Sequence, residues 1–181
     1  MLFYGEEIGM GENLAIEGRL SVRSPMQWSD GKHAGFSTVA DAQALCRPVV
    51  DDGRFGPAEV NVTRQRREDD SLLNWFERLI RRRRESPEIG FGELEILDAG
   101  VPSVLAHRCD WNDSTVVAVH ELAGEAVTVK LVLKGLDDAD ALVDLFSADL
   151  HTLETGQTEL QLEPHGYRWL RVRRSGRRLP P

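Results

Sequence analysis

The sequence predicts a mainly β fold in which an antiparallel β-sandwich follows an irregular segment that ends in one helix. Two patterns support this prediction. Between Gly5 and about Arg67, glycines and prolines recur with little periodicity, whereas from Gly92 onward apolar residues alternate with polar ones. Alternation with a period of two is typical of strands that bury one face. The pattern changes near residue 90, so we expect domains at 1–90 and 91–174 and a basic tail at 175–181.

The chain opens with a short apolar run, Met1–Tyr4, which stops at Gly5. Such a run is consistent with the end of a buried strand. The irregular stretch that follows is far longer than the loops of compact domains. A stretch of that length is expected where it is functional or belongs to a larger body.

One clear helix is predicted at Ser71–Glu85. Its first turn is acidic and offers Asp69, Asp70 or Ser71 as the cap. Arg81–Arg84 would lie in its last turn, where cations oppose the negative end of the helix dipole, and Pro87 would close the element. Its apolar residues fall on one stripe at helical spacing: Leu72, Leu73, Phe76, Leu79 and Ile80.

Several short strands follow, separated by turn residues such as Ala123-Gly124-Glu125 and Thr155-Gly156. Their number and spacing favour an antiparallel sandwich. The expected strands lie around Leu94–Ile96, Ser103–Arg108, Val116–His120, Val127–Leu133, Ala141–Phe146, Glu159–Glu163 and Tyr167–Arg173.

Composition excludes several classes of protein. The 181 residues carry a net charge of −8, which opposes general binding to nucleic acid. No apolar run approaches the roughly 20 residues of a membrane span. The first residues show no basic region and no cleavage site of a secretory signal, so we expect a cytoplasmic protein. The arginines at 171, 173, 174, 177 and 178 are interpreted as a solvated tail.

Metal and cofactor chemistry is not expected. The two cysteines, Cys46 and Cys109, make neither a disulfide framework nor a zinc site, and both are interpreted as reduced, packed thiols. The five histidines show no metal-binding spacing. His107 and His120 are interpreted as ordinary sheet residues.

Three segments carry a resemblance to a known family. They are Met1-Leu2-Phe3-Tyr4-Gly5-Glu6-Glu7-Ile8-Gly9-Met10-Gly11, the stretch Arg23-Ser24-Pro25-Met26-Gln27-Trp28, and Asn61-Val62 with Ser71-Leu72-Leu73-Asn74-Trp75. Together they resemble the eighth barrel strand, the following loop and the last barrel helix of the α-amylase superfamily (glycoside hydrolase family 13). The second segment is similar to the Arg-Thr-Pro-Met-Gln-Trp signature of trehalose synthases and oligo-1,6-glucosidases, with Ser24 in place of threonine. The later strands resemble the family's C-terminal sandwich.

The resemblance implies that residues 1–90 are the C-terminal remnant of a (β/α)8 barrel. It also implies an enzyme of maltose, trehalose or α-glucan metabolism. The family's nucleophile, acid/base and stabilising carboxylates come from barrel strands four, five and seven, which have no counterpart here. We therefore expect no catalytic residue in this chain, and no activity from it alone. Met1 resembles an internal strand residue, so a fragment, a misplaced start and a decayed gene all stay open, as does a separate chain that supplies the other strands.

A different class of function also stays open, namely a non-catalytic carbohydrate-binding or interaction module. Arg23 matches the signature arginine beside the sugar pocket, and it either contacts substrate or forms an ion pair that holds the loop. Glu6 and Glu7 are interpreted as loop anchors. Of the four tryptophans, Trp111 is the candidate sugar platform because it lies in a polar turn. The Leu72/Phe76/Leu79 face of the helix is expected to pack either on the sandwich or on a second copy of the chain, in which case the chain self-associates.

Overall fold

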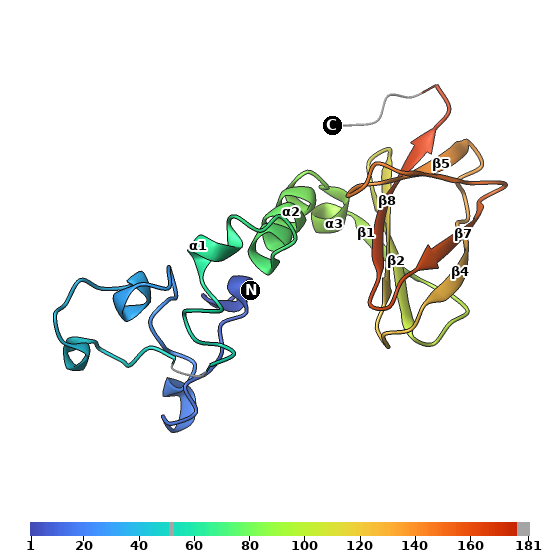
Figure 1. Ribbon diagram of the computed structural model, residues 1–181. Coiled ribbons are helices and arrows are strands. Elements are labelled where there is room, and N and C mark those ends of the chain that lie inside the picture. Colours follow the sequence, from blue (N-terminus) through green and yellow to red (C-terminus); the bar gives the residue numbers. More distant parts are fainter. Residues whose placement is uncertain (51–52, 177–181) are drawn as a thin grey trace. The chain divides into compact units, whose positions relative to one another are not determined.

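The computed structural model describes residues 1–50 and 53–176, and the chain divides into two compact units, Met1–Ile80 and Arg81–Pro181 (Figure 1). The last five residues of the predicted basic tail, 177–181, lie outside the described residues. The longest helix in the described ranges has 13 residues. None there is long and apolar enough to cross a membrane.

The first unit consists mostly of loops joined by short helices. It contains the 3₁₀ helices η1 (Glu6–Ile8), η2 (Gly18–Leu20), η3 (Lys32–Gly35) and η4 (Ala42–Ala44), the helix α1 (Val62–Gln65) and the start of α2 (Leu72–Arg84). The strand expected at Met1–Tyr4 is wrong, since these residues have no regular structure and all four side chains are exposed. A strand requires a hydrogen-bonding partner, and no described strand pairs with this segment.

The apolar core of the first unit is small. Ile8, Met26 and Val62 are buried together, and Met10, Val60 and Leu73 pack against them half-exposed. Polar contacts add to this core. The side chain of Gln65 donates to the Ile8 carbonyl at 2.7 Å and accepts from the Leu73 backbone at 3.0 Å. The order of this unit therefore depends strongly on hydrogen bonds between its loops.

Helix α2 confirms the predicted element. Ser71 accepts from the Asn74 backbone nitrogen at 3.3 Å, as a capping residue does, and four arginines fill the last turn. No residue of α2 is buried, and the side chains of Leu72 and Ile80 are 40% and 45% exposed. The apolar stripe thus forms as predicted and is partly covered, since Leu73 packs on the small core while Leu72 and Ile80 stay exposed.

The second unit is the predicted antiparallel sandwich. One sheet has the strand order β1-β2-β3-β8-β5-β6, and β4 pairs with β7 in the other (Figure 1). The short helix α3 precedes the strands and was not predicted, nor was β6. The bounds are α3 (Glu88–Phe91), β1 (Glu93–Leu97), β2 (Val104–Trp111), β3 (Ser114–Glu121), β4 (Val127–Val132), β5 (Ala139–Asp144), β6 (Leu150–Thr152), β7 (Gln157–Leu162) and β8 (Tyr167–Arg174).

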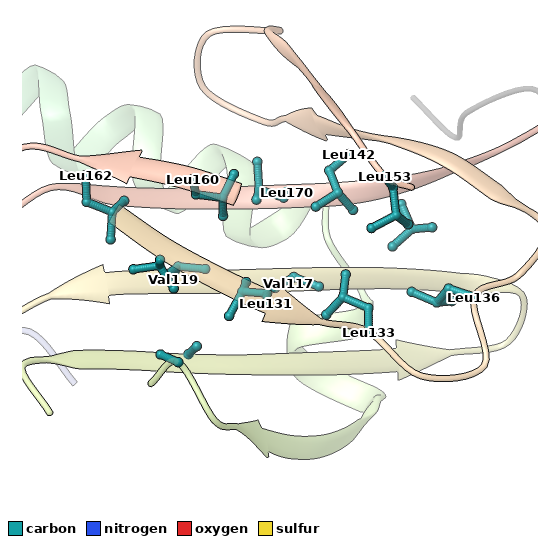
Figure 2. Close-up of a cluster of buried hydrophobic side chains, with 14 residues drawn as sticks. Val117, Val119, Leu131, Leu133, Leu136, Leu142, Leu153, Leu160, Leu162 and Leu170 are labelled. Carbon is teal, nitrogen blue, oxygen red and sulfur yellow. The ribbon is translucent and has the colours of Figure 1, made fainter. Parts of the chain in front are cut away.

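The sandwich has a continuous apolar core between its sheets (Figure 2). Both sheets contribute alternate residues, such as Val117 and Val119 from β3 and Leu160 and Leu162 from β7. The cluster contains 14 buried residues, against three in the first unit, so hydrophobic burial stabilises the sandwich far more strongly.

The interpretation of the C-terminal arginines as a solvated tail is wrong for those that the structure describes. Arg171 is 4% exposed within β8. Arg173 and Arg174 form ion pairs with Asp140 and Asp138, at 3.0 and 3.3 Å. Strand β8 extends three residues beyond Arg171. Arg173 and Arg174 therefore lie close to the carboxylates of Asp140, in β5, and Asp138, just before β5.

A buried carboxylate ties two turns of the sandwich together. Glu121, at the end of β3, accepts backbone hydrogen bonds from Ala123, Gly124 and Glu125 and from His165 in the turn before β8. Burial opposes its ionisation, but the bonds from Ala123, His165 and Gly124 outweigh that effect and lower the pKa of Glu121 to about 2.

Two histidines stack on the six-stranded sheet. The rings of His107 and His120 lie 6.0 Å apart, and Trp169 donates from its indole nitrogen to His120 Nε2 at 3.2 Å. Burial lowers the pKa of His107. Burial, and then repulsion from His107, lowers the pKa of His120. Both are sheet residues, as predicted, and both favour the neutral form.

Candidate functional site

The Arg23–Trp28 signature is the structural centre of the first unit. Ser24, Pro25, Met26 and Gln27 are buried, whereas Arg23 and Trp28 at the two ends are exposed. Gln27 is fully buried, and its amide nitrogen donates to the Phe55 carbonyl at 3.0 Å and to the Val60 carbonyl at 2.5 Å. A buried amide held in this way fixes the path of the loop and so positions its exposed ends.

A cavity of about 690 Å³ lies beside Arg23. Its wall includes Phe3, Tyr4, Glu6, Arg19 and Arg23, all from the first unit. This volume is within the range of small-molecule sites. The cavity therefore combines aromatic faces, a carboxylate and two guanidinium groups, which suits a polar ligand with apolar faces.

The aromatic wall is anchored to the signature. Tyr4 donates from its hydroxyl to the Ser24 carbonyl at 2.9 Å, and the Phe3 and Tyr4 ring centroids are 4.6 Å apart. Each of the two residues is 44% exposed. Gly5, which follows, has φ of 91°, and a Cβ there would lie 3.0 Å from Met10 Cβ and Sδ. Glycine thus permits the sharp turn that directs the two rings to the cavity.

Arg23 is exposed, and within residues 1–50 and 53–176 its side chain has no hydrogen bond or ion pair. No ion pair through which Arg23 would hold the loop forms within these described residues, and that alternative stays a prediction. Arg23 lines the cavity, and its guanidinium carries five N–H donors. Contact with substrate stays a prediction.

Glu6 and Glu7 bond to the backbone, as predicted. Glu6 accepts from the Phe3 nitrogen at 3.0 Å, and Glu7 accepts from the Gly5 nitrogen at 2.7 Å. They lie in η1 instead of a strand. Both carboxylates therefore stabilise the turn around Gly5.

An apolar groove of about 320 Å³ lies elsewhere in the first unit. Met26, Trp28, Leu73, Phe76 and Ile80 line it. Three of these residues belong to the stripe of α2. Trp28 is 47% exposed, so sequence reasoning missed a second accessible tryptophan beside Trp111, which is 38% exposed. The exposure of Trp28 could not be predicted from the sequence, because this loop has no regular period that separates buried residues from exposed ones.

Metal-binding geometry does not occur in the described part of the chain, where no three His, Cys, Asp or Glu side chains are grouped suitably. Both cysteines are free thiols. Cys109 is buried as predicted, but Cys46 is exposed, which corrects the prediction for that residue.

Two known families match different parts of the chain. The α-amylase catalytic domain matches residues 1–92, and the sucrose hydrolase-like C-terminal domain matches residues 114–171. A trehalose synthase from Pimelobacter sp. (strain R48) is 31% identical over 95% of this chain, which covers 30% of that relative. A trehalose synthase from Thermus thermophilus is 34% identical over 92% of the chain, which covers 17% of it. The chain thus spans less than a third of these relatives, in their C-terminal part.

Solved structures show the same fold. The α-amylase from H. orenii matches 95% of this chain with a TM-score of 0.65 and 21% identity, and the chain covers 32% of it. An α-glucosyl transfer enzyme, XgtA, matches 95% with a TM-score of 0.67 and 21% identity, again with 32% of that structure covered. The catalytic-domain match extends over half of the sequence, and the chain therefore belongs to the α-amylase family, corresponding to a C-terminal part of its trehalose-synthase-like members.

Proposed function

We propose that this chain is the C-terminal part of an α-glucosyl-processing enzyme that acts on maltose, trehalose or a related α-glucan. In this proposal residues 1–90 complete a (β/α)8 barrel and one wall of its sugar pocket, and the sandwich at 91–174 stabilises the barrel. The observation that supports it most directly is the cavity beside Arg23. It lies within the part that matches the α-amylase catalytic domain, and the guanidinium at its wall has no partner in the described chain.

We infer that residues 1–90 contribute sugar contacts but no catalytic carboxylates. Retaining glycoside cleavage requires a nucleophilic carboxylate and a general acid about 5 Å apart. Glu6 and Glu7 are engaged with backbone nitrogens, so they serve the loop. We infer that the catalytic carboxylates come from segments outside these 181 residues. Arg23 would donate hydrogen bonds to sugar hydroxyls, and Phe3 and Tyr4 would contact the apolar face of the sugar.

The test joins this chain to the catalytic segment of a trehalose synthase relative, in place of that relative's matching C-terminal part. The chain alone should not turn over maltose, trehalose or a chromogenic α-glucoside, whereas the folded chimaera should. Arg23→Ala in the chimaera should reduce kcat/KM by about tenfold or more, the typical loss of a charged hydrogen bond. Arg47→Ala is the matched control, because Arg47 is half-buried and, in the described part of the chain, donates only to the adjacent Cys46 carbonyl, outside the cavity wall.

Two outcomes would contradict the proposal. One is turnover by the isolated chain that survives further purification, because this chain would then contain its own catalytic groups. The other is a folded, active chimaera in which Arg23→Ala has no more effect than Arg47→Ala. In the second case the cavity beside Arg23 would not be part of the sugar site.

We also propose that the isolated chain self-associates through the helix face of Leu72, Phe76 and Leu79. Phe76 lines the apolar groove, and exposed contiguous apolar surface favours association. Phe76→Asp should lower the mass measured by light scattering over a concentration series. Arg84→Asp changes an exposed residue of the same helix and should leave the mass unchanged. If Phe76→Asp alters neither mass nor stability, this face is not an interface.

The remaining expectations of partners and location stay predictions. Net charge of −8 argues against binding to nucleic acid, which a gel-shift titration would check. A cytoplasmic location without membrane attachment would be checked by cell fractionation.

A further inference from the structure

The second unit presents two adjoining aromatic rings to solvent. Phe91, the last residue of α3, is 72% exposed, and Trp111, the last residue of β2, is 38% exposed. Their ring centroids lie 5.7 Å apart, and the ring planes are tilted by 41°. A single exposed apolar residue is ordinary, but two touching rings at the surface indicate a contact site.

Both rings are held by rigid elements. Glu88, in α3, accepts from the Ser114 hydroxyl of β3 at 2.5 Å, which ties the short helix to the hairpin that presents Trp111. Gly92, the residue after Phe91, is tightly packed. A Cβ at this position would lie 2.4 Å from the Glu88 carbonyl oxygen and 2.7 Å from that of Asp110. The rings are therefore positioned before any ligand arrives, which lowers the entropic cost of binding.

Polar groups without internal partners flank the rings. A Cβ added to Gly90 would lie 2.6 Å from a terminal nitrogen of Arg83, so that guanidinium lies over the residue next to Phe91. Arg83 has no hydrogen bond or ion pair within the described residues. Asn112, which follows Trp111, is exposed, and its side chain has no such bond within the same ranges. Arg83 therefore offers N–H donors beside the residue that precedes Phe91, and Asn112 adds an exposed amide directly after Trp111.

This combination suits one class of ligand. A pyranose ring has an apolar C–H face that packs on an aromatic ring, and hydroxyl groups at its rim that accept from guanidinium and amide groups. Two rings tilted against each other fit consecutive units of a curved α-linked chain better than the flat ribbon of a β-1,4-linked chain.

We propose that Phe91 and Trp111 form a binding site for α-linked glucosyl oligosaccharides on the sandwich, with Arg83 donating hydrogen bonds to their hydroxyls. The choice of sugar rests on the proposed function, but the site itself is built wholly within the second unit and is separate from the cavity beside Arg23. A hollow of about 620 Å³ elsewhere in this unit is lined by residues such as Lys130, His151 and Glu159 and has no Phe, Tyr or Trp in its wall. It lacks the flat apolar surface that a pyranose face requires.

The test titrates the full chain with maltoheptaose by isothermal calorimetry and tryptophan fluorescence. Trp111→Ala and Phe91→Ala should each weaken binding by about tenfold or more, as expected for aromatic anchors. Arg83→Ala should weaken it several-fold, and Arg84→Ala, which removes the neighbouring exposed arginine, should not. Cellohexaose should bind more weakly than maltoheptaose. Because Phe91 is highly exposed, Phe91→Ala should retain the thermal stability of the parent chain, which keeps the test valid if Trp111→Ala misfolds.

Controls in the first unit separate this proposal from the proposed function. Trp28→Ala and Arg23→Ala should leave maltoheptaose binding unchanged. If either abolishes binding while Trp111→Ala and Phe91→Ala do not, the glucan occupies the first unit, which overturns this proposal and strengthens the proposed function. Absence of binding to the folded parent chain also overturns it, but leaves the chimaera experiment unaffected. Loss of self-association in Phe91→Ala without any sugar binding would identify the rings as a protein contact instead.

Discussion

The buried ion pair between Arg171 and Glu88 should strongly affect the stability of the sandwich. We expect the effect on the free energy of unfolding to be large when only one partner is removed. The two side chains are 5% and 1% exposed, and Arg171 Nε lies 3.4 Å from Glu88 Oε1. At that distance and an effective dielectric constant of about 20, the attraction is about 5 kcal/mol. Desolvation of both charges offsets much of it. Removing both charges should therefore change the free energy of unfolding little, whereas removing only one should lower it strongly, because the other charge then stays buried without a partner.

Further bonds increase the cost of breaking this pair. Arg171 donates to the Glu85 carbonyl at 3.0 Å and to the Ser86 hydroxyl at 3.3 Å, and Ser114 donates to Glu88. We expect Glu88→Leu and Arg171→Met each to lower the free energy of unfolding of the sandwich by about 3–5 kcal/mol. The double variant should be destabilised far less than the sum of the two, because no unpaired charge remains buried.

Urea unfolding followed by circular dichroism measures these values, and the four proteins form a double-mutant cycle. Arg173→Met, which removes a more exposed cation of the same strand, is the matched control and should cost about 1 kcal/mol or less. The reasoning is refuted if each single variant loses less than about 1 kcal/mol, or if the double variant loses the full sum.

Three further predictions concern pH and local stability. Because the pKa of Glu121 is lowered to about 2, its contribution to stability is complete above the ordinary pKa of 4.5 and should be lost as the pH falls toward 2. The stability of the Glu121→Gln variant, measured by acid unfolding, should lack this part of the pH dependence. Because the pKa values of His107 and His120 are lowered from 6.5, stability should decrease as the pH falls below about 6.5, and thermal melting of His120→Phe should show a weaker dependence; an equal slope would contradict this. Hydrogen exchange should be fast in Met1–Arg67 and slow in Gly92–Arg173, and equal protection would reveal a packing partner for the first segment.

The sequence predicted the sandwich well because its strands alternate with a period of two. The same rule explains what it missed, since β6 (Leu150–Thr152) has too few residues to display a period. Helix α3 was missed because Pro87 was expected only to end a helix, although proline also suits a helix start. Neither Glu88 nor Arg171 carries a local sign of burial. Their burial arises from tertiary contacts between a short helix and the last strand.

The candidate site was predicted in part. The signature identified Arg23 from a resemblance, but the pattern of residues could not show that its guanidinium has no hydrogen bond or ion pair within residues 1–50 and 53–176. The pairing of Phe91 with Trp111 was equally inaccessible, because Phe91 belongs to an unpredicted helix. The exposure of Trp111 alone was accessible to prediction, from the polar residues that follow it, although Trp111 ends strand β2 and does not lie in the turn itself.

The signature explains how one short segment can serve two surfaces of the first unit. Its middle residues are buried, and Gln27 anchors them to the carbonyls of Phe55 and Val60. Its ends emerge on different hollows, Arg23 at the large polar cavity and Trp28 at the apolar groove. With so few buried apolar residues in this unit, the amide of Gln27 supplies order that a larger core would supply elsewhere. The polar centre of the signature thus determines where Arg23 and Trp28 are exposed, so structural and ligand-facing roles fall on neighbouring residues of one loop.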